Sequence, residues 1–258
     1  MMLDCFDLSG KIAIVTGASK GLGFVFAKAL AKAGASLFLI ARNEEQLQMN
    51  AQSIISYGVP CDWAVADITQ EGEVAAAFRK CIDIYGRIDI FVNNAACGRN
   101  NIPPEQTSLE DWNFVIDTNL TGSFICAREA GKQMIRQKSG KIINLASMSG
   151  LIINKGVHGG SYEISKHGVI GLTRALAVEW AKHNINVNAL APGYFMTQLN
   201  RDFFDDHPDV LDQFIELTPA GRIGEPDELE GAIVFLASKA SDFMYGSVLV
   251  IDGGYTCW

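Results

Sequence analysis

The sequence predicts a doubly wound α/β fold, a single parallel sheet covered by helices on both faces. Two observations lead to this prediction. Short runs of consecutive apolar residues alternate with segments of helical period along all 258 residues. These runs are rich in consecutive apolar residues, as expected for strands buried on both faces of a parallel sheet. No linker, repeat or low-complexity tract interrupts the pattern, so we expect one domain over residues 1–258.

The elements follow in order along the chain. The expected strands, each a short apolar run, are Lys11–Val15, Ser36–Ala41, Cys61–Ala66, Ile88–Asn93, Lys141–Ser147, Asn186–Ala191 and Ser247–Ile251. Apolar residues spaced by three and one from Leu22 to Ala33 indicate the first helix, which ends before Gly34. The other expected helices are Glu44–Tyr57, Glu71–Tyr85, Leu109–Gln137, Tyr162–His183 and Pro226–Ala237.

Composition and charge argue against several classes of protein. The net charge of −8 opposes nucleic acid and anionic membranes as partners. No apolar run approaches the roughly 20 residues that span a bilayer, and Met1–Gly10 lacks the basic and apolar regions of a signal peptide. The six scattered cysteines favour free thiols in the cytoplasm over disulfides or zinc, and the four histidines have no metal-ligand spacing. We therefore expect a cytoplasmic protein without a metal site.

A glycine-rich turn lies where the first strand meets the first helix, with the sequence Thr16-Gly17-Ala18-Ser19-Lys20-Gly21-Leu22-Gly23. Glycines permit a sharp turn and let backbone N–H groups approach a pyrophosphate, and the helix N-terminus adds a favourable dipole. The spacing Gly-x-x-x-Gly-x-Gly differs from the Gly-x-Gly-x-x-Gly of other dinucleotide folds. The position of the turn, directly after an N-terminal strand, predicts a dinucleotide site.

Tyr162 and Lys166 are four residues apart, so they project from the same face of one predicted helix. A free phenol has a pKa of about 10 and is a poor base at neutral pH. An ammonium group about 5 Å away, at an effective dielectric constant near 20, is worth roughly 3 kcal/mol to the phenolate. Lys166 would thus lower the pKa of Tyr162 by about two. The pair predicts proton transfer to or from a substrate oxygen.

Six motifs in the same order resemble the short-chain dehydrogenase/reductase family over essentially the whole chain. They are the turn Thr-Gly-x-x-x-Gly-x-Gly, Asn93-Asn94-Ala95-Ala96 with Ala96 in place of the usual glycine, Asn119, the set Ser147, Tyr162 and Lys166, Pro192-Gly193 followed by Thr197, and Asp252-Gly253-Gly254. The resemblance implies a Rossmann fold and hydride transfer between a nicotinamide cofactor and a secondary alcohol or ketone.

The resemblance also implies four catalytic residues. Tyr162 would exchange the proton and Ser147 would hydrogen-bond the substrate oxygen, although the neighbouring Ser149 is an alternative. Lys166 would also hold the nicotinamide ribose. Asn119 would position a water that links Lys166 to solvent, unless it only caps or kinks its helix. Cys97 is interpreted as a small space-filling residue rather than a reactive thiol.

The second predicted strand is followed by Arg42 and has no acidic residue at its tip. An aspartate or glutamate there would bind the adenosine ribose and favour NAD. Together with Lys20, Arg42 forms a plausible clamp for the 2′-phosphate of NADP, so NADP(H) is expected over NAD(H). The alternative is that both are solvated surface charges. The full set of expected cofactor contacts is Gly17, Ser19, Lys20, Gly21, Leu22, Gly23, Arg42, the adenine-contacting pair Asp67 and Ile68, Asn94, Ala95, Tyr162, Lys166, Pro192, Gly193, Phe195 and Thr197.

Three stretches would surround the substrate pocket, and the third resembles a mobile lid over about residues 194–217. They are Gly98–Gln106, Met148–Ser161 and Tyr194–Leu217. The segments Glu179–Asn184 and Pro192–Phe195 are similar to gluconate 5-dehydrogenase-like members that act on polyols, sugars or sugar acids. A 3-ketoacyl-acyl-carrier-protein reductase is the alternative, followed by a nucleotide-binding regulator without turnover.

The resemblance further implies a homotetramer. The two long predicted helices, Leu109–Gln137 and Tyr162–His183, would pack across one two-fold interface. The last strand and the tail that ends in Tyr255, Cys257 and Trp258 would meet a partner across another.

Overall fold

The structure is a computed structural model that describes residues 3–98, 101–155, 157–158 and 160–258. Within these ranges, seven strands form one parallel sheet in the order β3-β2-β1-β4-β5-β6-β7. The strands are β1 Ile12–Thr16, β2 Ser36–Ala41, β3 Cys61–Val65, β4 Ile90–Asn93, β5 Gly140–Leu145, β6 Ile185–Pro192 and β7 Val248–Ile251. The predicted fold class is confirmed. Residues 99, 100, 156 and 159, in two of the predicted pocket loops, lie outside the described residues.

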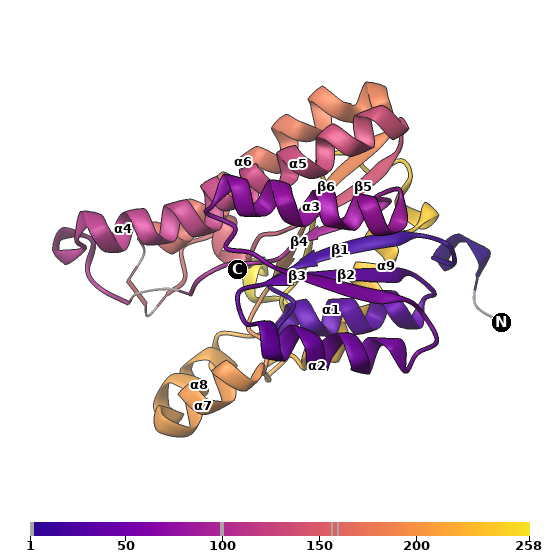
Figure 1. Cartoon of the computed structure of the whole chain (residues 1–258). Helices are drawn as coiled ribbons and strands as arrows, with labels where there is room; N and C mark the ends of the chain where they lie inside the picture. The colour runs from indigo at the N-terminus through magenta and orange to yellow at the C-terminus, as the bar shows by residue number, and fades with distance from the viewer. Residues whose placement is uncertain (1–2, 99–100, 156, 159) are drawn as a thin grey trace.

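Helices cover both faces of the sheet (Figure 1). On one face lie α1 Gly21–Lys32, α2 Glu44–Ile55 and α9 Glu230–Ala237, and on the other lie α3 Glu71–Tyr85, α5 Gly122–Gln137 and α6 Ser161–Trp180. Successive residues of β1 belong to different cores: Ala13 and Val15 pack with the first set of helices, and Ile12 and Ile14 with the second. Alternation along a strand thus divides the apolar residues between two hydrophobic layers.

The carboxyl ends of the strands form the edge where ligands bind in this architecture. The chain order reverses between β1 and β4, which are neighbours in the sheet, and such a switch point opens a crevice. Three helices project on this side of the sheet (Figure 1): α4 Leu109–Ile116, α7 Gln198–Asp206 and α8 Pro208–Glu216. The fold therefore brings the glycine-rich turn and the ends of β4, β5 and β6 to one edge.

The predicted helix Leu109–Gln137 is helical over its whole length, but it is not regular. A π-helical turn, Asp117–Thr121, lies between α4 and α5. Such a turn holds one more residue than an α-helical turn, and the apolar pattern on either side gives no sign of it. Asn119, a predicted catalytic residue, lies in the middle of this turn.

Other differences lie at the ends of helices. The predicted helix from Tyr162 ends in a 3₁₀ turn, Ala181–His183, and Pro226–Leu229 is a 3₁₀ turn before α9. The predicted lid segment contains α7, capped by Thr197, and α8, which begins with Pro208. None of the described helices has both the length and the hydropathy that a membrane span requires.

Candidate active site

The glycine-rich turn is closely packed on its inner side. Gly17 has φ of 66°, and a Cβ added to Gly23 would come within 2.3 Å of the Gly17 carbonyl oxygen. Asn94 braces the same turn, because its Nδ2 donates to the Thr16 carbonyl at 2.8 Å. The Thr16 hydroxyl oxygen in turn accepts from the backbone N–H groups of Asn94 and Ala95. Asn94 and Ala95 therefore hold the turn against the end of β4.

A buried asparagine on α2, which sequence reasoning missed, supports the turn from behind. The Asn50 side chain is 3% exposed, and its Nδ2 donates to the carbonyl oxygens of Ala18 at 2.8 Å and Ser19 at 3.0 Å. These two carbonyls are thereby drawn away from the outer side of the turn. No local pattern marks Asn50, since its partners lie about thirty residues earlier in the chain.

The outer side of the turn fits an anionic group. Lys20, the residue before α1, makes no side-chain hydrogen bond to the first turn of the helix. At Gly21 an added Cβ would meet nothing within 4 Å. Uncapped N–H groups at a helix N-terminus, with room in front of them, suit a pyrophosphate.

At the end of β2, Arg42 is exposed and its Nη1 lies 3.7 Å from Oδ2 of Asp67. Burial acts to raise the pKa of Asp67, but hydrogen bonds from Thr69 and the nearby Arg42 outweigh it and hold that pKa below its usual value. Asp67 thus carries a negative charge beside Arg42. Ile68 is buried and lies close to Gly122, where an added Cβ would come within 2.9 Å of its side chain.

Ser147, Tyr162 and Lys166 converge beyond the end of β5. Ser147 lies two residues after the end of that strand, and α6 carries the other two residues on one face. The Lys166 Nζ donates to the Leu145 carbonyl at 2.8 Å and lies 5.8 Å from the centre of the Tyr162 ring. Burial lowers the pKa of Lys166 to about 8, with an opposing contribution from Cys97. The predicted proximity of phenol and ammonium is present in the structure.

Asn119 links the π-helical turn to the same helix. Its Oδ1 accepts from the Cys97 N–H at 2.8 Å, and its Nδ2 donates to the Cys97 carbonyl at 3.2 Å and to Ser165 Oγ at 3.1 Å. The Ser165 hydroxyl donates to the Tyr162 carbonyl at 2.6 Å. The side chain of Asn119 therefore connects the loop after β4 to the backbone of Tyr162.

A cavity of about 310 Å³ opens at this point. Predicted site residues that line it are Leu22, Ser147, Tyr162, Lys166, Pro192, Gly193, Phe195 and Thr197. Predicted residues outside this lining are Gly17, Ser19, Lys20, Gly21, Gly23, Arg42, Asp67, Ile68, Asn94, Ala95 and Asn119. Most of these belong to the glycine-rich turn and its surroundings, beside the cavity. Tyr194 and Asn200, in the predicted pocket segment Tyr194–Leu217, also line it.

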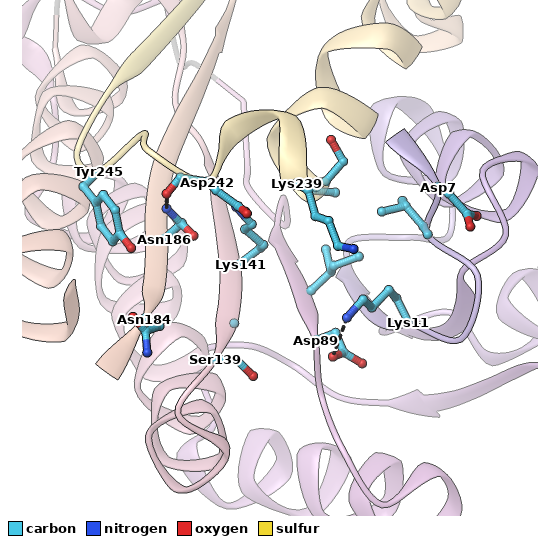
Figure 2. Close-up of a pocket in the computed structure, with 15 residues that line it drawn as sticks. Asp7, Lys11, Asp89, Ser139, Lys141, Asn184, Asn186, Lys239, Asp242 and Tyr245 are labelled. Carbon is cyan, nitrogen blue, oxygen red and sulfur yellow. Dashed lines mark hydrogen bonds and ion pairs between the residues drawn. The ribbon is translucent and has the colours of Figure 1, made fainter. Parts of the chain in front are cut away.

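A second cavity, of about 360 Å³, lies at the opposite, amino end of the strands. Figure 2 shows its charged lining, in which Lys11 lies 3.7 Å from Asp89 and Lys141 lies 2.7 Å from Asp242. It contains none of the predicted site residues. We therefore assign the chemistry to the smaller cavity at the carboxyl ends.

The cysteines and the side chains that could bind a metal ion are the remaining candidates for reactive groups. All six cysteines are free thiols, and burial raises the pKa of Cys97. Among the described residues, no group of three or more His, Cys, Asp or Glu side chains could hold a metal ion.

Comparison with known proteins agrees with this geometry. The family model described as enoyl-(acyl carrier protein) reductase matches residues 17–256. The gluconate 5-dehydrogenase of Gluconobacter oxydans is 38% identical over 253 residues, which cover 98% of this chain and 97% of that protein. The chain belongs to the short-chain dehydrogenase/reductase family. It is an oxidoreductase that acts on CH–OH groups with a nucleotide cofactor.

Two further relatives narrow the comparison within this family. The galactitol 2-dehydrogenase of Rhizobium johnstonii is 38% identical over 253 residues, covering 98% of each chain. The crystal structure of a gluconate 5-dehydrogenase from Burkholderia cenocepacia in complex with NADP and tartrate has a TM-score of 0.93 and 39% identity. It covers 99% of this chain and 98% of that one.

Proposed function

We propose that this short-chain dehydrogenase/reductase uses NADP(H) to interconvert a secondary alcohol and a ketone in a polyol, sugar or sugar acid. The observation that carries the proposal is the convergence of Ser147, Tyr162 and Lys166 on one cavity beside a phosphate-binding turn. Hydroxyl and amide groups of Ser149, Tyr194 and Asn200 add polar lining that suits a hydroxylated substrate. The names of the relatives, which include gluconate and galactitol dehydrogenases, support the same class.

The residues of the turn fit the cofactor. The first turn of α1 and the open space at Gly21 would hold the pyrophosphate, and Arg42 with Lys20 would hold a 2′-phosphate. When bound, the nicotinamide accepts or donates the hydride. We assign the contact with the nicotinamide ribose to Lys166.

Proton transfer falls to the side chains at the cavity. Ser147 donates a hydrogen bond to the substrate oxygen and orients it, and Tyr162 gives that oxygen a proton during reduction or takes one during oxidation. The cationic Lys166 stabilises the phenolate through its field. Asn119 fixes the position of α6 through Ser165, and we retain its predicted place in the proton relay.

A substrate panel tests the proposal. Oxidation of NADPH, followed by absorbance, would be measured with keto sugar acids, simple ketones and acetoacetyl thioesters. We expect the largest kcat/KM with a keto sugar acid or keto sugar. A preference for acetoacetyl thioesters would favour a ketoacyl reductase, and cofactor binding without any turnover would favour a regulator.

The pKa of Lys166 predicts the pH dependence of ketone reduction. Below pH 8 the ammonium is charged and keeps Tyr162 acidic, and above about 8 it loses its proton. The value of kcat/KM should therefore be level up to about pH 8 and fall tenfold per pH unit above it. The measurement is kcat/KM with NADPH from pH 6 to 10, with cofactor binding titrated separately as a control. A flat profile to pH 10 would contradict the assignment.

We further propose that the chain forms a homotetramer. Exposed apolar side chains lie on the outer helices, with Leu109 on α4 and Val178 on α6 both more than three-quarters exposed. Light scattering at micromolar concentration should give about four times the chain mass of 28.0 kDa. Val178→Glu should yield a smaller species. Ile55→Glu, at an exposed position on α2 away from the proposed interfaces, should leave the mass unchanged. A wild-type monomer would refute the proposal.

A further inference from the structure

A buried asparagine lies directly behind the wall of the candidate active site. Asn154 is 2% exposed, and its Nδ2 donates to Ser149 Oγ and to Tyr194 Oη, both at 3.0 Å. Both of these residues line the cavity. The Ser149 N–H in turn donates to Ser147 Oγ at 3.1 Å. Asn154 is therefore connected to the substrate-binding serine through a single residue.

The oxygen of the Asn154 amide, Oδ1, is buried and has no hydrogen-bond partner among the described residues. Turning the amide over would place Nδ2 at the same point, so one polar atom lacks a partner in either orientation. Buried polar groups in folded proteins nearly always have a partner, and beside a ligand cavity that partner can be a water or a group of the ligand.

We propose that Asn154 determines substrate specificity by binding a hydroxyl group that the substrate carries next to its reacting carbon. This inference rests on the proposed function and narrows it to polyols, sugars and sugar acids with a neighbouring hydroxyl. Such a hydroxyl can donate to Oδ1, whereas the carbon chain beside the ketone of a ketoacyl thioester offers no donor.

The contact between Asn154 and the substrate depends on Tyr194. The Tyr194 ring stacks on Phe214 of α8, with ring centres 4.0 Å apart and an interplanar angle of 11°. Tyr194 lines the cavity and its hydroxyl accepts from Asn154 Nδ2, so the packing of α8 against Tyr194 helps to position the amide beside the cavity.

The test is a double-mutant-type cycle: the hydroxyl is removed from the substrate and the amide from the protein, separately and together. The value of kcat/KM is measured for a keto sugar acid and for its analogue without the neighbouring hydroxyl, on wild type and on Asn154→Leu. In wild type we expect loss of the hydroxyl to lower kcat/KM by at least about tenfold. In Asn154→Leu the same loss should change it by less than about threefold, because the hydrogen-bonding group is gone.

Two controls separate specificity from folding. Asn154→Asp keeps an acceptor at this point and should keep the discrimination between the two substrates. Asn154→Ala, which also removes the amide, replaces Asn154→Leu if the leucine variant does not fold. The melting temperature and NADPH affinity of each variant report on the fold. If Asn154→Leu lowered kcat/KM by the same factor for both substrates, the inference would be overturned and the proposed function would stand. A wild type that reduces simple ketones or thioesters but no hydroxylated substrate would overturn the proposed function, and the inference with it.

Discussion

Tyr162→Phe should lower kcat by about 10²- to 10⁴-fold, because general acid–base catalysis contributes that much and the substitution deletes the proton donor. The ring remains, so its packing 5.8 Å from Lys166 Nζ should persist. NADPH affinity should accordingly be nearly unchanged. The measurements are kcat with a saturating ketone and the dissociation constant of NADPH by fluorescence titration.

Lys166→Ala provides the comparison for this result. It should lose both turnover and cofactor affinity, since Lys166 is assigned to the field on Tyr162 and to the ribose. A Tyr162→Phe enzyme that retains about a third of the wild-type rate would remove Tyr162 from the reaction.

Arg42→Asp should reverse the cofactor preference. Each charge-assisted contact to a 2′-phosphate is worth roughly 1.5–3 kcal/mol, so losing the Arg42 contact should lower kcat/KM with NADPH by about tenfold to a hundredfold or more. The Arg42 guanidinium lies 3.7 Å from Asp67, but the arginine side chain is still 75% exposed. It therefore remains available to bind a phosphate. An aspartate at position 42 would instead accept hydrogen bonds from a free ribose hydroxyl.

The measurement is kcat/KM for NADPH and NADH with one shared substrate, on wild type and on Arg42→Asp. Arg79→Asp makes the same charge change at an exposed position on α3 and should leave the ratio as in wild type. Equal efficiency with both cofactors in wild type would mean that Lys20 and Arg42 are solvated surface charges.

The sheet could be predicted from the sequence because its signals are local. Strands such as Ile12–Thr16 are buried on both faces and therefore mostly apolar, and Gly86 ends α3 with φ of 77°. The glycine-rich turn followed from an equally local pattern. Tyr162 and Lys166 could be placed together because helical spacing alone puts them on one face.

What the sequence did not reveal depends on contacts between distant segments. The π-helical turn surrounds Asn119, whose side chain bonds to Cys97 and Ser165, and no apolar period encodes that arrangement. Asn50 and Asn154 act through partners that a single-residue pattern cannot indicate. The two helices of the lid segment were missed although Thr197 and Pro208 are ordinary signals of helix starts.

The segment that contains α7 and α8 has a small hydrophobic core of its own, centred on Phe204, Phe214 and Ile223. None of these three residues belongs to the described clusters that hold the sheet and α6. Substitutions there reach the strand ends through Tyr194, whose ring stacks on Phe214. Libraries aimed at new substrates should accordingly randomise residues 198–217 and leave β5 and α6 unchanged.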